Sequence, residues 1–289
     1  MEDNARSRTA EANARIRTQH CLHGTPPLIL EDSFALNFLS PEVAEVARSR
    51  GFERPTEFRA AAVILGRTRY AEDCFEQTLG EGVQQHVALG AGFDSFPLRQ
   101  AGSMTQVHFY EIDQPATQQW KRELLQSTGC EIPANLEFVP ANLERETVLQ
   151  ALARSSFRCA EPAFFSWLGN TIYLTREAIF RTLVSFAEEL APGSRIVFDY
   201  GVPLEFVAPE DAEVVQLGWK ITAEWGEPQR SWLNPGAFPD EVRAVGLEVV
   251  ENLTPQQMAE RYFSGRNDAL RPMTHQHYIH LRVGNSEGK

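Results

Sequence analysis

Residues 84–99 contain the feature that most constrains how this chain can fold. The apolar run His86–Leu89 predicts a short buried strand, and the small residues at 90–92 predict a turn directly after it. Asp94 and Ser95 then offer side chains that can cap a following helix. Because glycine has no Cβ, such a turn lets backbone N–H groups come close to a ligand. The stretch therefore predicts a nucleotide-like cofactor lying across the turn.

The composition of the 289 residues is that of an ordinary globular protein, with 43% hydrophobic and 23% charged residues. The net charge of −12 disfavours nucleic acid as a partner. The first residues show no apolar core of the kind a signal peptide has, and no apolar run approaches the roughly 18 residues that a membrane span needs. Four cysteines without a C-x-x-C pair favour reduced thiols over a zinc site or a disulfide framework. We therefore expect a cytoplasmic protein that holds no metal and binds neither nucleic acid nor membranes, with no expectation for its oligomeric state.

The first third of the chain is predicted to be helical, over 5–22, 41–50 and 56–79. We interpret residues 1–82 as an N-terminal helical cap packed on a core of residues 83–289. Strands and helices alternate in this core, which predicts a mostly parallel sheet covered on both faces, and a cap insertion is expected at about 203–236. Strands are predicted over 84–90, 106–112, 136–139, 162–168, 194–200, 246–253 and 276–283, and helices over 114–127, 144–155, 176–190, 204–224, 237–245 and 255–263.

Residues at the ends of the second and third strands indicate which cofactor the turn holds. Glu111 follows Gly90 by 21 residues (111 − 90), close to the spacing of about 20 at which an acid accepts hydrogen bonds from ribose hydroxyls. Asp113 is the second candidate for this role, unless its side chain only caps the helix that follows. After the third strand, Asn142 stands beside Leu143, where an amide and an apolar side chain could meet an adenine.

The glycine pattern distinguishes between kinds of nucleotide cofactor. Ser95 stands where the nicotinamide motif G-x-G-x-x-G has its third glycine, and no Gly-Lys-Ser/Thr sequence of a phosphate-binding loop follows the turn. S-adenosylmethionine has a ribose and an adenine but no pyrophosphate, so it suits this pattern better. The alternatives are an NAD(P)-dependent oxidoreductase and a protein that keeps the fold without catalysis.

Three segments carry a family resemblance: Val87–Asp94, Tyr110–Pro115 and Trp167–Thr175. They resemble the leucine carboxyl methyltransferase family, and the closer match is its bacterial and actinomycete branch of S-adenosylmethionine-dependent O-methyltransferases. Further segments that resemble this branch are Ser7–Ala10, Gly66–Tyr70, Gly226–Trp232 and Arg261–Arg266. The resemblance implies an α/β class I methyltransferase (Rossmann-like) fold: a seven-stranded, mostly parallel sheet with an antiparallel last strand and an N-terminal helical cap.

The resemblance also implies roles for individual residues. Arg17 and Arg67 match basic positions that hold the methionine carboxylate, and Gly90 matches the position under the methionyl group. Asp113 matches the ribose acid, and Asn142 with Leu143 matches the pair that contacts adenine. The sequence departs from the family where Asn142 replaces a common Asp, Leu168 a Glu and Phe96 a polar residue. The full set of predicted cofactor residues is Arg17, Arg67, Gly90, Ala91, Gly92, Asp94, Glu111, Asp113, Asn142, Leu143 and Trp167.

Candidates for the catalytic step follow the fourth and fifth strands. Tyr173, Asp199 and Tyr200 stand where the methyl acceptor should lie, although Asp199 could equally be a strand-end acid that binds loop amides. Apart from Asp199, no side chain is clearly placed to act as a general base. This favours an acceptor that needs none: the carboxylate of a small molecule or peptide, or an acidic hydroxyl of a natural product. The aromatic residues Trp225, Trp232, Phe238 and Tyr262 line the acceptor pocket or pack inside the cap.

Overall fold

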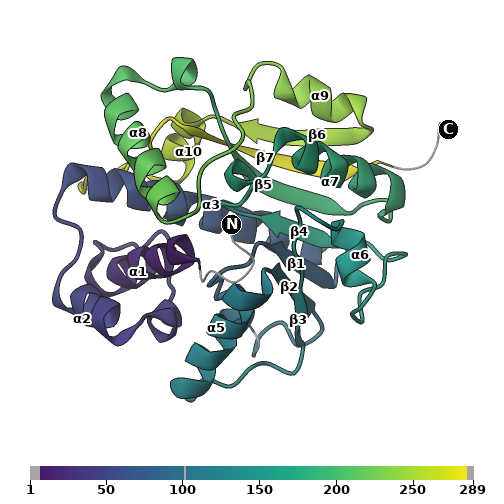
Figure 1. Cartoon of the computed structure of the whole chain (residues 1–289), viewed down its shortest axis with the longest axis horizontal. Helices are drawn as coiled ribbons and strands as arrows, with labels where there is room; N and C mark the ends of the chain where they lie inside the picture. The colour runs from purple at the N-terminus through teal and green to yellow at the C-terminus, as the bar shows by residue number, and fades with distance from the viewer. Residues whose placement is uncertain (1–6, 101, 285–289) are drawn as a thin grey trace.

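The computed structural model describes residues 7–100 and 102–284, and its centre is one seven-stranded sheet (Figure 1). The order across the sheet is β3-β2-β1-β4-β5-β7-β6, and β7 runs antiparallel to both of its neighbours while the other pairs are parallel. This confirms the predicted fold class. The strands are β1 (Gln85–Leu89), β2 (His108–Asp113), β3 (Leu136–Pro140), β4 (Phe164–Trp167), β5 (Arg195–Gly201), β6 (Leu247–Leu253) and β7 (Gln276–Val283).

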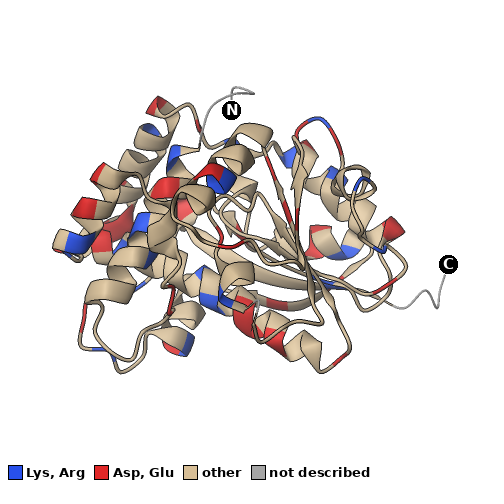
Figure 2. Cartoon of the chain, turned by 90° about the horizontal axis from the view of Figure 1, so that it is seen from below, with Lys and Arg blue, Asp and Glu red and all other residues tan. Residues whose placement is uncertain are grey.

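The central strands are apolar because both of their faces are covered. Every residue of β1 and β4 is buried, and few charged residues lie on the central strands (Figure 2). Phe164 packs with the helix α3 on one face, whereas its neighbour Phe165 packs with α7 on the other. The helices are α1 (Arg8–His23), α2 (Pro41–Ser49), α3 (Pro55–Leu79), α4 (Phe96–Gln100), α5 (Pro115–Ser127), α6 (Val148–Leu152), α7 (Arg176–Glu189), α8 (Pro209–Glu224), α9 (Phe238–Ala244) and α10 (Pro255–Tyr262).

The N-terminal helices place α1 beside the glycine turn. The Ser7 hydroxyl accepts a hydrogen bond from the Ala10 N–H and so caps α1, whereas the predicted residues 5 and 6 lie outside the described residues. Ala10 and Ala14 pack in one cluster with Phe93 of the turn. Meanwhile α3 contributes Tyr70 and Phe75 to the core under the sheet, so the first 82 residues supply both a cap and one covering helix.

Two predicted helices differ from the structure. Residues 144–146 form a turn that Asn142 starts, and α6 begins only after Thr147, which caps it. The predicted helix 204–224 is divided into a 3-10 turn, η3 (Leu204–Phe206), and α8, which begins at Pro209 because proline is favoured at the first position of a helix. Two further 3-10 turns, η1 (Ala35–Phe38) and η2 (Thr171–Tyr173), lie near the site described below.

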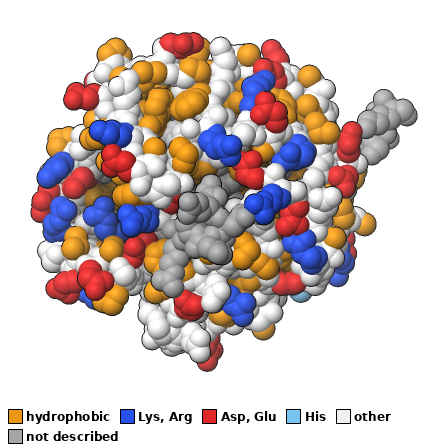
Figure 3. All heavy atoms as spheres, in the orientation of Figure 1, with side chains coloured by type: hydrophobic (Ala, Val, Ile, Leu, Met, Phe, Trp, Pro, Cys, Tyr) orange, Lys and Arg blue, Asp and Glu red, His pale blue; other side chains and the backbone are white. Residues whose placement is uncertain are grey.

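The surface is mixed in charge. On the face shown in Figure 3, basic and acidic side chains are interspersed among apolar ones. None of the described helices combines the length and the apolar character that a membrane crossing requires.

Candidate functional site

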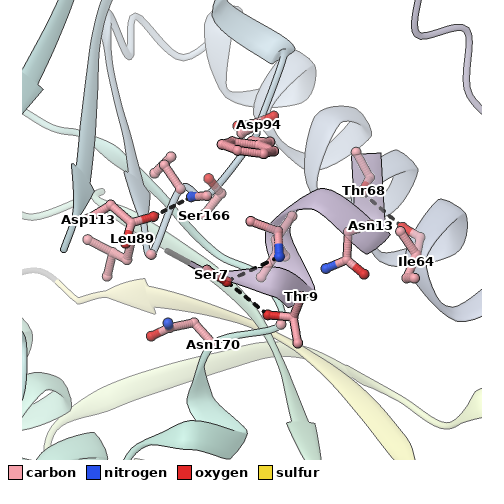
Figure 4. Close-up of a pocket in the computed structure, with 18 of the residues that line it drawn as sticks. Ser7, Thr9, Asn13, Ile64, Thr68, Leu89, Asp94, Asp113, Ser166 and Asn170 are labelled. Atoms are coloured by element: carbon pink, nitrogen blue, oxygen red, sulfur yellow. Dashed lines mark hydrogen bonds between the residues drawn. The ribbon is translucent and has the colours of Figure 1, made fainter. Parts of the chain in front are cut away.

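Two adjoining cavities lie at the carboxyl ends of the parallel strands. The first, here called the arginine cavity, is lined by Arg17 and Arg67 and has a volume of about 100 Å³. Figure 4 shows other residues that line it, among them Ser7, Asp113 and Asn170. The second, the β3 cavity, is lined by Asn142 and Leu143 after β3 and has a volume of about 240 Å³. The residues that line both cavities are Gly90, Asp113, Asn170, Tyr173 and Glu227. One elongated ligand can therefore span the two cavities across the glycine turn.

The turn after β1 is the floor of the arginine cavity. Gly90 adopts a positive φ of 61°, and a Cβ at this position would lie 2.5 Å from Cγ of Asn170. The turn is fixed to the next strand by the Ala91 N–H, which donates to the Ile112 carbonyl at 3.1 Å. Only glycine fits at position 90, so the backbone itself forms the surface that a ligand would meet. Gly92 and Asp94 also line this cavity, and Asp94 accepts a hydrogen bond from the Phe96 N–H at 3.0 Å, which caps α4.

Arg17 comes to the cavity from α1. Its Nε donates to Oδ2 of Asp32 at 2.8 Å, and its Nη2 donates to the Phe93 carbonyl. Both side chains are buried, with 9% of Arg17 and none of Asp32 exposed. Among the described residues, Nη1 of Arg17 has no acceptor, which leaves one edge of the guanidinium available to a ligand.

Arg67 comes from α3 and lies against the turn after β4. Its Nη1 donates to Oδ2 of Asp199 at 3.3 Å, and a Cβ on Gly169 would lie 2.4 Å from Nη1 and Nη2. The Gly169 N–H donates to Oδ1 of the same Asp199 at 2.6 Å. Asp199 is fully buried, so it acts through Arg67 and Gly169 and does not meet the ligand. Asp199 thus binds a loop amide, as expected for a strand-end acid, and it lines neither cavity.

The two acids of β2 have different surroundings. Asp113 lines both cavities and accepts hydrogen bonds from the Gly92 N–H and, at 2.6 Å, from the Gln114 N–H. Burial raises the pKa of Asp113 to about 6, against the effect of these two donors. Glu111 lies deeper, lines neither cavity and accepts from Lys121 at 2.6 Å. Burial raises the pKa of Glu111 to about 7 although Lys121 lowers it. Glu111 is thus part of a buried ion pair, and of these two acids only Asp113 lines the cavities.

Trp167 and Tyr200, a predicted cofactor residue and a predicted catalytic residue, line neither cavity. Trp167 is fully buried in β4 and lines neither cavity, and its Nε1 donates to Oδ1 of Asn170 at 3.1 Å. Side chains alternate along a strand, so Ser166 and Leu168 line the arginine cavity in its place. Tyr200 is also fully buried, and its hydroxyl donates to Oδ1 of Asn252 at 3.0 Å, which removes it from the catalytic candidates.

Tyr173 is the catalytic candidate that does line the cavities. It belongs to η2, directly after β4 and its loop. Burial raises the pKa of Tyr173 to about 12, and the nearby Glu227 adds to this shift. The phenol is therefore neutral at ordinary pH and can donate a hydrogen bond.

Comparisons with known proteins identify the family of the chain. Residues 10–187, more than half of the chain, match the family model described as leucine carboxyl methyltransferase. This chain belongs to the leucine carboxyl methyltransferase family. A relative from Bacillus subtilis, named "Putative S-adenosyl-L-methionine-dependent methyltransferase YktD", is 30% identical over 97% of this chain and 99% of its own length. A relative from Mycobacteroides abscessus with the same general name is 31% identical over 70% of this chain and 65% of its own length.

Solved structures show the same fold. A DUF574 family protein from Streptomyces avermitilis superposes with a TM-score of 0.59 at 17% identity, covering 93% of this chain and 96% of that one. A methyltransferase structure from Thermobifida fusca, titled as putative, gives a TM-score of 0.57 at 16% identity, covering 93% and 94%. As a member of the leucine carboxyl methyltransferase family, the chain is a methyltransferase, and the oxidoreductase alternative is set aside.

Sequence reasoning missed two residues of the site that lie inside the family segments. Asn170 lies opposite Gly90, and Glu227 lines both cavities while its carboxylate accepts hydrogen bonds from the N–H of Arg8 at 2.9 Å and from the hydroxyl of Ser7 at 3.1 Å. Glu227 thus ties the loop after α8 to the start of α1. Four aromatic residues were predicted either to line an acceptor pocket or to pack inside the cap, and they line neither cavity: Trp225, Trp232, Phe238 and Tyr262. Among the described residues, no group of three or more His, Cys, Asp or Glu could hold a metal ion.

Proposed function

We propose that this member of the family binds S-adenosylmethionine across the two cavities and transfers its methyl group to an oxygen, preferably that of a carboxylate. The chemistry of the residues that line the two cavities supports this proposal. The free edge of the Arg17 guanidinium suits a methionyl carboxylate, and the backbone at Gly90, which lines both cavities, suits the atoms next to it. Asp113 at the junction suits the ribose, and Asn142 with Leu143 in the β3 cavity suits the adenine.

The choice of oxygen acceptor rests on one observation: among the described residues, no histidine, lysine or cysteine lines either cavity. The acids that do line them already have partners: Asp94, Asp113 and Glu227 accept hydrogen bonds from backbone N–H groups, and Glu144 lies 3.2 Å from Nη1 of Arg230. A general base is therefore lacking, and an acceptor that is ionised at neutral pH needs none. A carboxylate is such an acceptor.

The residues of the chain then bind and align the reactants. When bound, the sulfonium cofactor supplies an activated methyl group, so the protein chiefly has to hold the acceptor oxygen in line with it. Arg67 and the neutral phenol of Tyr173 can each donate a hydrogen bond to an acceptor oxygen in the arginine cavity. Asp199 keeps Arg67 in place.

The test is a pair of measurements on the purified protein. S-adenosylhomocysteine should bind in calorimetry and NADH should not; a protein that binds no S-adenosylhomocysteine at high micromolar concentration contradicts the proposal. A panel of carboxylic acids, phenols and peptides is then incubated with methyl-labelled S-adenosylmethionine, and the labelled products are treated with mild alkali. Methyl esters release labelled methanol under these conditions whereas methyl ethers keep the label, so the treatment separates carboxylate from hydroxyl acceptors.

A further inference from the structure

Asp32 lies outside both cavities, yet its carboxylate joins four segments of the chain beside them. Its Oδ2 accepts from Nε of Arg17 at 2.8 Å and from the Ser95 hydroxyl at 2.6 Å. Its Oδ1 accepts from the Ala35 N–H at 3.0 Å and lies 3.8 Å from Nε of Arg99. The donors belong to α1, to the end of the glycine turn, to η1 and to α4. Asp32 is 1% exposed, so these bonds are not screened by water.

The charges around Asp32 are divided between two pairs. Arg99 is held by Glu72, to which its Nη2 and Nη1 donate at 2.5 and 3.2 Å. Arg17 has only Asp32 as a carboxylate partner among the described residues. Burial by itself raises the pKa of Asp32, but Arg17, Arg99 and the Ser95 hydroxyl outweigh it, so the net shift is downward and the group stays ionised. Asp32 is therefore a fixed negative charge whose closest cation is Arg17.

This geometry decides how Arg17 faces the cavity. With Nε on Asp32 and Nη2 on the Phe93 carbonyl, the guanidinium plane is held at two points before any ligand arrives. Among the described residues, this leaves without an acceptor the N–H groups on the opposite edge of the guanidinium, on Nη1 and the second one on Nη2. An arginine held in this way loses little side-chain freedom on binding, which raises the affinity for an anionic group in the cavity.

We propose that Asp32 is the positioning residue for Arg17, and that it sets the affinity of the site for the amino-acid end of the cofactor but not for its adenosine end. This inference rests on the function proposed above. A residue that only stabilised the fold would affect the binding of both ends of the cofactor, whereas Asp32 should affect the amino-acid end alone.

The experiment compares two ligands that differ at that end. S-adenosylhomocysteine carries the amino-acid group and 5′-methylthioadenosine lacks it. By calorimetry, Asp32→Asn should lower the affinity for S-adenosylhomocysteine about ten- to hundredfold, by analogy with the loss of an outer partner of a metal ligand. The affinity for 5′-methylthioadenosine should change by no more than about twofold. The matched control is Asp240→Asn on α9, whose side chain is 80% exposed and should change neither affinity.

Non-additivity gives the second criterion. Arg17→Gln should also lower the affinity for S-adenosylhomocysteine alone. The double variant Arg17→Gln/Asp32→Asn should bind this ligand no more weakly than Arg17→Gln, because Asp32 acts through Arg17. The inference is overturned if Asp32→Asn lowers the affinity for both ligands equally. It is also overturned if the losses of affinity in the two single variants add in the double variant. A wild-type protein that binds neither ligand contradicts the proposed function, which is a different result.

A measurement on the wild type covers the case in which Asp32→Asn does not fold. The ¹⁵N resonance of the Arg17 Nε–H is assigned by its loss in Arg17→Gln, and its exchange with solvent is followed with and without S-adenosylhomocysteine. An Nε–H that is already protected without ligand supports a prearranged arginine. An Nε–H that becomes protected only with ligand overturns the inference.

Discussion

The arginine cavity and the β3 cavity adjoin, yet they are built in different ways. In the arginine cavity, each cation is paired with an acid whose side chain has no exposed area: Arg17 with Asp32, and Arg67 with Asp199. At the β3 cavity, the pair of Arg230 and Glu144 lies at 3.2 Å with 45% and 32% of its side chains exposed. Buried charges are expensive to leave unpaired, whereas exposed pairs contribute little. One cavity is therefore prearranged, and the other is a surface that water can reach.

Because of this difference, the two cavities should differ in how strictly they select a ligand. A prearranged charge favours one geometry of an anionic ligand and resists change, because its partners come from several elements of the fold. The β3 cavity depends mainly on one segment, residues 141–145, and on the loop that contains Pro228 and Arg230. We expect substitutions to have large effects in the first cavity and small effects in the second.

The largest expected effect belongs to Asp199→Asn. The amide can still accept from the Gly169 N–H, but Arg67 is left as a buried charge without a partner. Removing one member of a buried ion pair costs about 3–5 kcal/mol, so the free energy of unfolding should fall by that amount. Urea unfolding followed by circular dichroism measures it, with Asp240→Asn as the exposed control. A loss below about 1 kcal/mol would mean that water reaches Arg67 and that the charges of the two cavities differ less in their burial.

An intermediate effect is expected at the junction, where Asp113 lines both cavities. Burial raises the pKa of Asp113 from 3.8 to about 6, and the nearby Glu227 also raises it, while the two N–H donors and Lys121 lower it. In the folded protein the carboxyl thus stays protonated up to a higher pH than in the unfolded chain. Between about pH 4 and pH 6 its ionisation lowers the stability of the ligand-free protein as the pH rises. The ionised form, however, is the better acceptor for ribose hydroxyls.

Cofactor affinity should therefore depend on pH with the opposite sign. We expect the affinity for S-adenosylhomocysteine to be constant above about pH 7 and to fall by up to about tenfold per pH unit below about pH 6. Calorimetry at a series of pH values measures this slope, and Asp113→Asn should remove it while weakening binding at neutral pH. If the slope persists in Asp113→Asn, another group controls binding and Asp113 is not the ribose acid.

Local patterns in the sequence predicted the glycine turn, the strand ends and the order of the elements. Gly90 and Asp113 were found because a strand that ends in a glycine or an acid is visible within a few residues. The N-terminal helices were located for the same reason. The short α6 was overestimated because Thr147, a helix cap, lies inside an otherwise helical pattern.

Features that depend on register or on distant contacts could not be predicted. Trp167 and Tyr200 each stand one residue from a position that supports the site, and a shift of one residue along a strand turns the side chain to the other face. Asp32 and Glu227 were missed because their partners lie in other elements. Glu227 is 220 residues from Ser7, and no local pattern marks such a contact.

The smallest effect is expected for Arg230→Ala at the edge of the β3 cavity. The backbone N–H of Arg230 donates to the Ile172 carbonyl at 2.7 Å, so the loop should keep its path without the side chain. An exposed ion pair contributes roughly 0–1 kcal/mol, which limits the change in affinity for S-adenosylhomocysteine to about fivefold. Since salt screens exposed charges, this change should disappear at high ionic strength, while the loss in Arg17→Gln should persist. If Arg230→Ala lowers the affinity for S-adenosylhomocysteine tenfold or more and salt does not reduce this loss, Arg230 contacts the ligand directly. The β3 cavity would then be as selective as the arginine cavity.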